Sequence, residues 1–241
     1  MNFESVHPLQ RSGEASSGGQ GERLRRISVS QQIQESLRAR IVSLELAPGQ
    51  GLSRSEIAAH YGVSQTPVRD ALMKLEEEGL LDIYPQSKTE VSRIDVDQAR
   101  ETQFLRLSLE LEVTRRLAQK KDPTATAPAR RILGLQKEAL ADGDLGLFAE
   151  LDRRFHGSLC EAAGVGGLWA LVASRSGHID RLRNLNLPDP GKPANILHYH
   201  GLILDAVESG DTAAAEAAVR GHLSGTLDAV DQIVGRHPEY F

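Results

Sequence analysis

Asp152 and His156 are the pair of residues whose types and spacing most directly suggest chemistry. They stand four apart in LDRRFHGSLCEAAG, a segment with helical patterning, so both side chains project from one face of a helix, one turn apart. His200 and His222 form a second pair, about ten residues before and eleven after the turn Gly210-Asp211. On two antiparallel helices that rise about 1.5 Å per residue, these imidazoles would face each other at nearly the same height.

One carboxylate and three imidazoles form a ligand set that suits Zn²⁺ or another divalent first-row ion, with one or more coordination positions open. The spacing within each pair does not fix how the two pairs lie relative to one another. From the residues alone, it therefore stays open whether the set binds metal or each histidine is an ordinary core or surface residue. The single cysteine, Cys160, excludes an internal disulfide and a cysteine-based metal site.

The elements that would position these residues are helices. From residue 95 onward nearly every segment has helical spacing, and Asp122-Pro123, Gly143-Asp144 and Gly210-Asp211 act as stop or cap signals between segments. No alternating strand pattern interrupts them, so the sequence predicts an all-α helical bundle. The predicted helices are Asp95–Lys121, Thr124–Ala141, Asp144–Ala163, Gly167–Leu187, Pro193–Ser209 and Thr212–Gly235.

The segment from Leu52 to Val91 has a different pattern, which predicts a winged helix-turn-helix. Ser53 followed by Glu56 is a capping box that starts a helix, and Gly62 ends that helix. Thr66-Pro67 reads as a cap followed by the first residue of a second helix. The short segments Leu81–Ile83 and Thr89–Arg93, on either side of a turn at Pro85–Lys88, then predict two strands of a hairpin wing.

A helix-turn-helix places its second helix in the major groove of DNA, where the first residues of that helix reach base edges and phosphates. Arg69 offers a two-pronged donor suited to guanine, and Gln65 is long enough to touch a base or a phosphate. The alternative is that these are ordinary solvated side chains, and residues 22–93 hold as many acidic as basic residues, so general basicity does not attract DNA. The predicted DNA contacts are Arg54, Ser64, Gln65, Thr66, Arg69 and Lys88.

Length and composition fit two modest domains. The chain has 241 residues, is 40% hydrophobic and only 4% aromatic, and carries a formal net charge of −5, which suits a helical core of aliphatic residues. No apolar run approaches the roughly 20 residues that span a bilayer, so we expect a cytoplasmic, nucleoid-associated protein with no membrane partner. The fold class is mainly α: a disordered tail (1–27), a winged helix-turn-helix (28–94), an all-helical effector-binding and dimerisation domain (95–236) and a tail (237–241).

Two sets of motifs resemble a known family. APGQ-x-LS at Ala47–Ser53 and GVSQTPVRDAL-x-x-LE-x-EGL at Gly62–Leu80 are similar to the DNA-binding domain of the GntR family of bacterial transcription regulators. The chain departs from the family pattern at Gln65, where arginine is common, and at Lys88, where the wing often has glycine. FLRLSLELEVTRRL, LDRRFHGSLCEAAG and HGLILDAVESGDTAAAEAAVRGH resemble the FCD effector domain of the FadR-like branch.

The resemblance implies a set of ligands and partners. In many members of that branch, the positions matching Asp152, His156, His200 and His222 bind a metal that helps to hold a small carboxylate. Zinc is the expected ion here, with nickel or manganese as alternatives. Arginine pairs both oxygens of a carboxylate, so the predicted effector-binding residues are Arg106, which matches a position that often faces the pocket, and Arg175, His178 and Arg181 in SRSGHIDRLR. The family also implies a homodimer on a two-fold operator.

We therefore expect a transcription repressor that binds double-stranded operator DNA under the control of a small organic acid, and not an enzyme. One alternative is a metal-dependent, hydrolase-like enzyme that uses the histidine and aspartate residues, although no motif such as His-Glu-x-x-His places a general base. The other alternative is a DNA-binding protein whose metal site is purely structural. Binding of a small acid by the folded protein separates this last alternative from a metabolite sensor.

Overall fold

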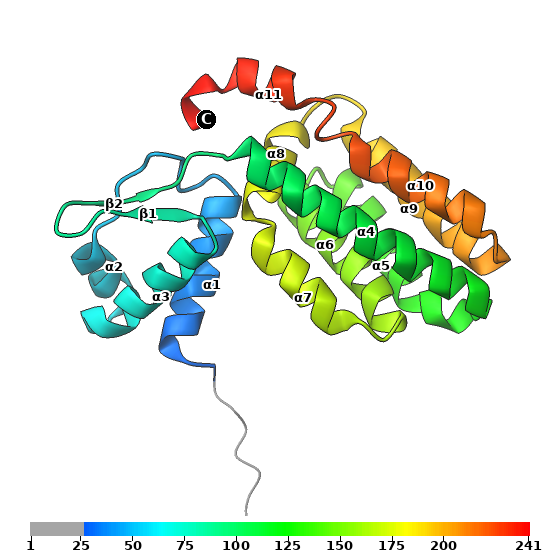
Figure 1. The fold of residues 1–241 in the computed structure, drawn as a ribbon, viewed down its shortest axis with the longest axis horizontal. Helices are drawn as coiled ribbons and strands as arrows, with labels where there is room; N and C mark the ends of the chain where they lie inside the picture. Colours follow the sequence, from blue (N-terminus) through cyan, green and yellow to red (C-terminus); the bar gives the residue numbers. More distant parts are fainter. Residues whose placement is uncertain (1–26) are drawn as a thin grey trace, which may run out of the picture.

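A computed structural model describes residues 27–241, and the predicted disordered tail lies outside them except for its last residue. The N-terminal elements lie at one end of the molecule and the helical bundle at the other (Figure 1). The elements in order are α1 (Val29–Val42), α2 (Arg54–Tyr61), α3 (Gln65–Glu77), β1 (Leu81–Ile83), β2 (Thr89–Val91), α4 (Val96–Lys120), α5 (Pro123–Ala141), α6 (Leu145–Ala162), α7 (Gly166–Arg175), α8 (Gly177–Asn186), α9 (Lys192–Ser209), α10 (Thr212–Ser224), α11 (Val230–Arg236) and the 3₁₀ turn η1 (Pro238–Tyr240).

The N-terminal elements form the predicted winged helix-turn-helix. Ser53 Oγ accepts from the Glu56 amide at the start of α2, and Gly62 ends α2 in the left-handed conformation with φ 65°. The start of α3 differs slightly from the prediction, because Ser64 rather than Thr66 is the cap, so Pro67 is the third helical residue. The first three amides of a helix need no intrahelical partner, which is why proline is tolerated there as well.

The wing is a two-stranded antiparallel hairpin in which Asp82 pairs with Glu90. Its tip turns through Gln86, which has φ 57°. Lys88, the position where the family often has glycine, does not have a positive φ, so it requires none of glycine's conformational freedom. The buried apolar side chains of α1, α2, α3 and the hairpin form one core, which includes Ile41, Leu72 and Val91.

The bundle confirms the predicted all-α architecture, but two of the predicted helices are broken. Gly167–Leu187 divides into α7 and α8 at Ser176, and Thr212–Gly235 divides into α10 and α11. Gly177, directly after the first break, must be glycine for close packing, because a Cβ there would lie 2.5 Å from Leu80 Cδ2. Without a side chain at Gly177, α8 packs closely against the winged helix-turn-helix, and it runs in a different direction from α7 (Figure 1).

The last residues do not form a free tail. The Ile94 amide donates to Tyr240 O at 2.8 Å, and Arg93 Nη1 donates to the carbonyl oxygens of Glu239 and Phe241. Tyr240 and Phe241 also pack against the core formed by α8, α11 and the start of α4. The C-terminal segment thus holds the link between the wing and α4. Among the described residues, no helix is long and apolar enough to cross a membrane.

Candidate functional site

Three helices of the bundle bring Asp152, His156, His200 and His222 together; we call these four residues the metal cluster. Helix α6 supplies Asp152 and His156 one turn apart, α9 supplies His200, and α10 supplies His222. Nε2 of His222 lies 3.0 Å from Nε2 of His156 and 3.3 Å from Nε2 of His200. Asp152 Oδ1 lies 3.4 Å from His200 Nε2 and 3.9 Å from His156 Nε2. The structure therefore joins the two pairs that the sequence left unplaced.

Hydrogen bonds outside the metal cluster fix two of its rings. His156 Nδ1 donates to the Glu110 carboxylate at 2.7 Å, because an ionised carboxylate only accepts. His200 Nδ1 lies 2.9 Å from Gln136 Oε1, while the Gln136 amide nitrogen donates to Phe148 O. A neutral imidazole that carries its hydrogen on Nδ1 has a free electron pair on Nε2. Both rings thus direct electron pairs into the middle of the cluster.

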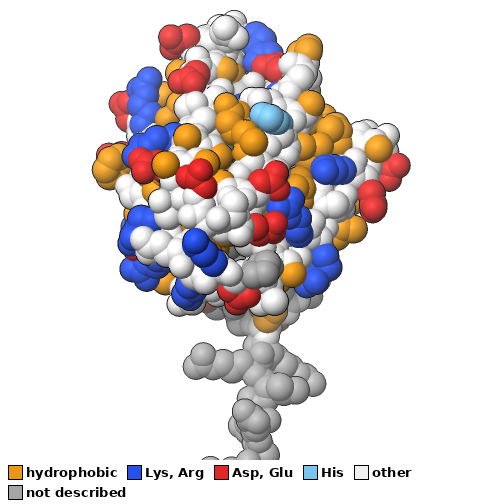
Figure 2. Space-filling model, turned by 90° about the vertical axis from the view of Figure 1, so that its right-hand side faces the viewer, with side chains coloured by type: hydrophobic (Ala, Val, Ile, Leu, Met, Phe, Trp, Pro, Cys, Tyr) orange, Lys and Arg blue, Asp and Glu red, His pale blue; other side chains and the backbone are white. Residues whose placement is uncertain are grey.

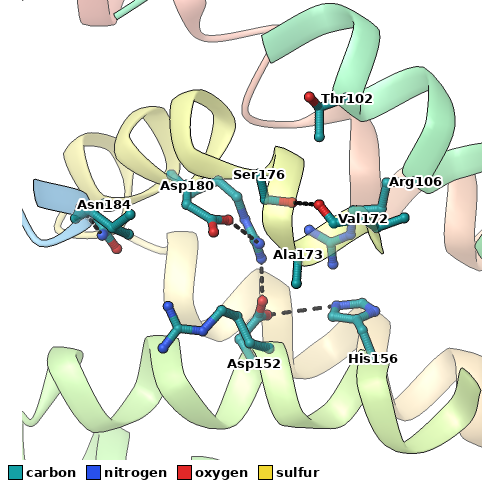
Figure 3. Close-up of polar contacts among 12 residues, drawn as sticks. Thr102, Arg106, Asp152, His156, Val172, Ala173, Ser176, Asp180 and Asn184 are labelled. Atoms are coloured by element: carbon teal, nitrogen blue, oxygen red, sulfur yellow. Dashed lines mark hydrogen bonds and ion pairs between the residues drawn. The ribbon is translucent and has the colours of Figure 1, made fainter. Parts of the chain in front are cut away.

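Asp152 adds an oxygen without a hydrogen-bond partner. Its Oδ2 accepts from Arg183 Nη2, whereas Oδ1 is fully buried and receives no hydrogen bond. Figure 3 shows the Asp152 carboxylate between His156 and the helix that carries Asp180. Burial alone would raise the pKa of Asp152, but the Arg183 guanidinium and the three imidazoles hold it well below its usual range. The carboxylate is thus ionised, with one oxygen free to bind a cation.

These donors fit a first-row metal ion. Bond lengths of about 2.0–2.1 Å around a tetrahedral Zn²⁺ put neighbouring ligand atoms about 3.3–3.4 Å apart. The contacts given above run from 3.0 to 3.9 Å, and all four ligand atoms lie within 4.8 Å of one another. A cation bound at this point would contact the anionic Asp152 oxygen and the electron pairs of His156 and His200 at once. The donor set, two imidazoles with fixed tautomers and an unpartnered carboxylate oxygen, therefore fits a metal ion.

Burial keeps His200 and His222 neutral, as metal ligands must be. It lowers the pKa of His200 to about 3 and that of His222 well below its usual value, with the neighbouring imidazoles adding to the effect. Glu110 behaves in the opposite way. Burial would raise its pKa, but His156 and Arg106 lower it to about 2. Neutral His200 and His222 rings therefore lie near the ionised carboxylates of Asp152 and Glu110 at pH 7.

A small cavity of about 40 Å³ adjoins the metal cluster. Asp152, Arg183 and Lys192 line it from the bundle, and Val42 lines it from α1, the first helix of the winged helix-turn-helix. Asn184 closes the same region by donating to Val42 O at 2.7 Å. A second, smaller cavity shares Arg183 and Lys192 and reaches Arg106 and His222. Cationic side chains and a metal cluster therefore meet beside the contact between the two parts of the chain.

Of the four predicted effector-binding residues, only Arg106 lines a cavity beside the metal cluster. Its side chain is 2% exposed, its Nε donates to Glu110 at 2.5 Å, and its guanidinium lies 5.6 Å from the Trp169 ring centre. Its Nη2 is buried without a partner and its side chain lines the smaller cavity. Arg175, by contrast, is exposed on α7, and only its backbone oxygen accepts a hydrogen bond from Thr102.

His178 and Arg181 belong to another group of polar residues, which we call the junction cluster: Ser92, Asp95, His178 and Arg181. Ser92, His178 and Arg181 are buried, whereas Asp95 is exposed and takes part through its backbone amide. Arg181 Nη1 donates to Ser92 O at 2.6 Å, and Nη2 reaches Ser92 Oγ and His178 Nδ1. The Asp95 amide donates to His178 Nδ1 at 2.9 Å. The structure thus gives these two side chains partners in the link between the wing and α4, away from the metal cluster.

The predicted DNA-binding residues are all exposed at the other end of the molecule. Arg54, Gln65 and Lys88 line one groove between the starts of α2 and α3 and the wing. Ser64, Thr66 and Arg69 follow the start of α3, where free backbone amides also face outward. Lys88 pairs with Glu90 at 2.6 Å and lies over the Tyr84 ring, which holds it on the wing face beside the groove.

The face of the bundle farthest from this groove carries charges of both signs among apolar side chains (Figure 2). It therefore carries no basic patch of the kind that attracts nucleic acid.

Sequence reasoning missed Glu110, Gln136, Arg183 and Lys192. A signal for Glu110 was present, because it follows Arg106 by four residues on a helix face that continues with Val113 and Leu117, so a charge there must be buried. Arg183 stands in the same run as Arg181, and only the direction of α8 decides which of the two reaches the metal cluster. Nothing local in the sequence marks Gln136 or Lys192.

Comparison with protein families gives two matches. Residues 29–91 match the model described as bacterial regulatory proteins of the gntR family, and residues 101–225 match the FCD domain. The two matches cover the winged helix-turn-helix and the metal cluster, respectively.

Individual proteins agree with this. The chain is 40% identical over 205 residues to an HTH-type transcriptional regulator in an unstable DNA locus of Streptomyces ambofaciens, which covers 85% of this chain and 86% of that protein. It is 33% identical to the HTH-type transcriptional repressor RspR of Escherichia coli over 88% of this chain and 93% of the repressor. The solved structure of E. coli McbR/YncC has the same fold, with a TM-score of 0.73, 20% identity and coverage of 86% of this chain and 99% of that one.

Proposed function

Because the chain belongs to the GntR family of bacterial regulatory proteins and carries an FCD domain, we propose that it is a repressor whose affinity for its operator is controlled by a small organic acid bound beside a divalent metal ion. The family makes it a DNA-binding transcription regulator. The control by metal and acid is our proposal, and the observation that carries it is the metal cluster with its unpartnered Asp152 oxygen next to a cation-lined cavity.

Asp152, His156, His200 and His222 would hold the metal, for which zinc is the best match and nickel or manganese are alternatives. When bound, the metal would supply a Lewis-acidic position for one carboxylate of the effector. Arg106, Arg183 and Lys192 line the two cavities and would bind the remaining acidic oxygens. Burial beside Arg183 lowers the pKa of Lys192, as expected for cations gathered without enough counter-charge.

The effector would act through α8. This helix carries Arg183 at the cavity, Asn184 on α1, and Arg181 on the link to the wing. An acid that draws Arg183 away from Asp152 would change how α8 contacts both parts of the winged helix-turn-helix. Only a difference in affinity for two arrangements makes such a ligand an effector. We propose that the acid favours the arrangement that releases DNA.

The proposal assigns residues 28–94 to DNA reading and residues 95–236 to sensing and dimerisation. Arg54, Ser64, Gln65, Thr66, Arg69 and Lys88 would contact a two-fold operator in the nucleoid, with one half-site for each protomer of a homodimer in the cytoplasm. Light scattering on the purified chain measures the mass directly, and a monomer at micromolar concentration would contradict this part.

A hydrolase-like role has less support. Two buried carboxylates near the metal cluster, Glu110 and Asp180, are paired with Arg106 and Arg183, so neither is a free general base. The cavities are lined by cations, which suits binding of an acid better than activation of water.

The test uses fluorescence anisotropy with a DNA fragment from upstream of the gene, at moderate salt. We expect tight, sequence-selective binding that Arg69→Ala weakens about 5–150-fold, since a bidentate base contact contributes about 1–3 kcal/mol. A thermal-shift screen of small carboxylic and sugar acids on the zinc-loaded protein then finds the acid that stabilises it and lowers its DNA affinity. No selective DNA binding would overturn the proposed repressor, and selective binding without any stabilising acid would favour a purely structural metal site.

A further inference from the structure

We propose that Glu110 is a positioning residue that holds both His156 and Arg106, so that a metal ion and an anion strengthen each other's binding through it. The inference rests on the proposed function, because it concerns the same metal and the same acid. Glu110 stands on α4, is 3% exposed, and lies 46 residues from His156 in sequence. Its two carboxylate oxygens contact different partners, Oε1 with Arg106 and Oε2 with His156.

On one side, Glu110 decides the tautomer of His156. The carboxylate oxygen lies 2.7 Å from Nδ1, so Nδ1 carries the hydrogen and Nε2 keeps its electron pair toward the other ligands. A carboxylate behind a metal-binding histidine fixes the ring and also raises its basicity. Such an outer partner strengthens the bond to the metal, although it never touches the ion.

The three imidazoles of the metal cluster differ in this respect. His156 has a carboxylate behind it, His200 has the neutral amide of Gln136, and His222 Nδ1 is buried with no partner at all. His156 is therefore the one imidazole of the metal cluster whose outer hydrogen-bond partner is a carboxylate. Replacing Glu110 by glutamine would make the partner of His156 resemble that of His200, with a neutral amide in place of the carboxylate.

On the other side, Glu110 holds Arg106 in a set orientation. The carboxylate takes the Nε hydrogen at 2.5 Å, and the Trp169 ring packs near the guanidinium. Nη2 is thereby left buried without a partner, beside the cavity that His222, Arg183 and Lys192 also line. A buried guanidinium nitrogen with free hydrogens in a cationic cavity is a ready donor to an anionic oxygen.

The chain Arg106–Glu110–His156 therefore joins the two ligands. An anion on Arg106 partly neutralises that guanidinium and leaves more of the Glu110 charge to act on His156, which strengthens His156 as a metal ligand. A metal on His156 draws the Glu110 charge in the other direction, and linkage requires the two effects on affinity to be equal. Because of this coupling, the site binds the organic acid most tightly when a metal ion is already bound.

The test measures zinc affinity by competition with a chelator of known affinity, on the full-length chain after metal removal. We expect Glu110→Gln to bind zinc about 10–100-fold more weakly, as is typical when an outer partner of a ligand is removed, and Glu110→Asp to recover part of the loss. Glu112→Gln is the matched control, because Glu112 is an exposed acid on the same helix. We expect it to bind zinc as the wild type does.

Two further measurements separate positioning from a general loss of structure. The Co²⁺-substituted protein should change its visible spectrum in Glu110→Gln and not in Glu112→Gln, and succinate should gain less affinity from zinc in Glu110→Gln than in the wild type. Nitrogen NMR on the unmodified, metal-free protein reports the His156 tautomer even if the variant does not fold, and we expect the hydrogen on Nδ1.

The inference is overturned by a His156 hydrogen on Nε2, or by a folded Glu110→Gln that binds zinc as tightly as the wild type. A wild-type protein that binds no zinc, nickel or manganese would contradict the proposed metal site itself. The two failures are therefore distinguishable.

Discussion

The metal cluster and the junction cluster are both groups of largely buried polar side chains next to α8, yet they differ in how completely the chain satisfies them. In the junction cluster, Arg181, His178 and Ser92 find hydrogen-bond partners among one another and the nearby backbone. Around the metal cluster, Asp152 Oδ1, His222 Nδ1 and Arg106 Nη2 find none within the described residues. A satisfied buried group stabilises the fold, whereas an unsatisfied one is free to bind an ion, a water molecule or another ligand.

Residue type does not make this distinction. His178 and His200 are both buried histidines whose pKa burial lowers, to about 4 and about 3. His178 Nδ1 accepts from the Asp95 amide and from Arg181, while His200 Nε2 faces other electron-pair donors. Only the partner at the second nitrogen separates a structural histidine from a candidate ligand.

The largest expected effect on the free energy of unfolding is that of adding a metal ion to the metal cluster. Free zinc at about 1,000 times its Kd is expected to raise the free energy of unfolding by about 4 kcal/mol, because the ion binds the folded chain only. His200→Ala should remove most of this increment, and His198→Ala, an exposed neighbour, should keep it. Denaturant unfolding with and without zinc measures both, and an equal increment in His200→Ala would contradict the assignment of that ligand.

Removing Arg181, the central member of the junction cluster, should lower the free energy of unfolding by nearly as much as zinc raises it. Arg181→Ala leaves a cavity and strips donors from Ser92, so we expect unfolding to require about 3 kcal/mol less free energy. The zinc increment should not change, since Arg181 does not touch the metal cluster. Arg175→Ala, exposed on α7, is the control and should stay within about 0.5 kcal/mol of the wild type. If Arg181→Ala also lost the stabilisation by zinc, the two clusters would have to act as one site, which would contradict this prediction.

His178 should also make the contribution of the junction cluster to the free energy of unfolding fall at low pH. Burial first, and then Arg181, lowers the pKa of the folded imidazole to about 4 from the ordinary 6.5, so the unfolded chain binds the proton first as pH falls. The contribution of His178 is complete above pH 6.5 and is lost between about 6.5 and 4, at no more than about 1.4 kcal/mol per pH unit.

His178→Gln should therefore flatten the pH dependence of unfolding in this range, and His198→Gln should not. The measurement is the free energy of unfolding in urea at half-unit steps of pH. An identical pH profile for His178→Gln and the wild type would show that the junction cluster tolerates a protonated imidazole.

The smallest expected effect is that of a single hydroxyl. Ser92 Oγ donates to Gly79 O at 2.6 Å and accepts from Arg181 Nη2 at 3.3 Å. Ser92→Ala should lower the free energy of unfolding by about 1 kcal/mol, the usual worth of a buried hydrogen bond. Ser174→Ala, an exposed serine on α7, should have no measurable effect. A loss above about 3 kcal/mol would mean that the hydroxyl organises the whole junction cluster.

The sequence itself determined the elements and the family. Caps such as Ser53 and stops such as Gly62 act within a few residues, so the helix-turn-helix and the wing could be read locally, and helical spacing alone put Asp152 beside His156. The motifs that resemble the GntR and FCD patterns were equally local, and the family matches bear them out.

Tertiary structure decided which side chains meet across helices. The break at Ser176 and the close approach of Gly177 to Leu80 turn α8, which sends Arg181 to Ser92 and Arg183 to Asp152, and no local signal measures that rotation. The partners Glu110 and Gln136 come from helices distant in sequence from the histidines they contact. Periodicity fixes the face of one helix, but the packing of several helices fixes which faces share a site, because that depends on the volumes of all the side chains between them.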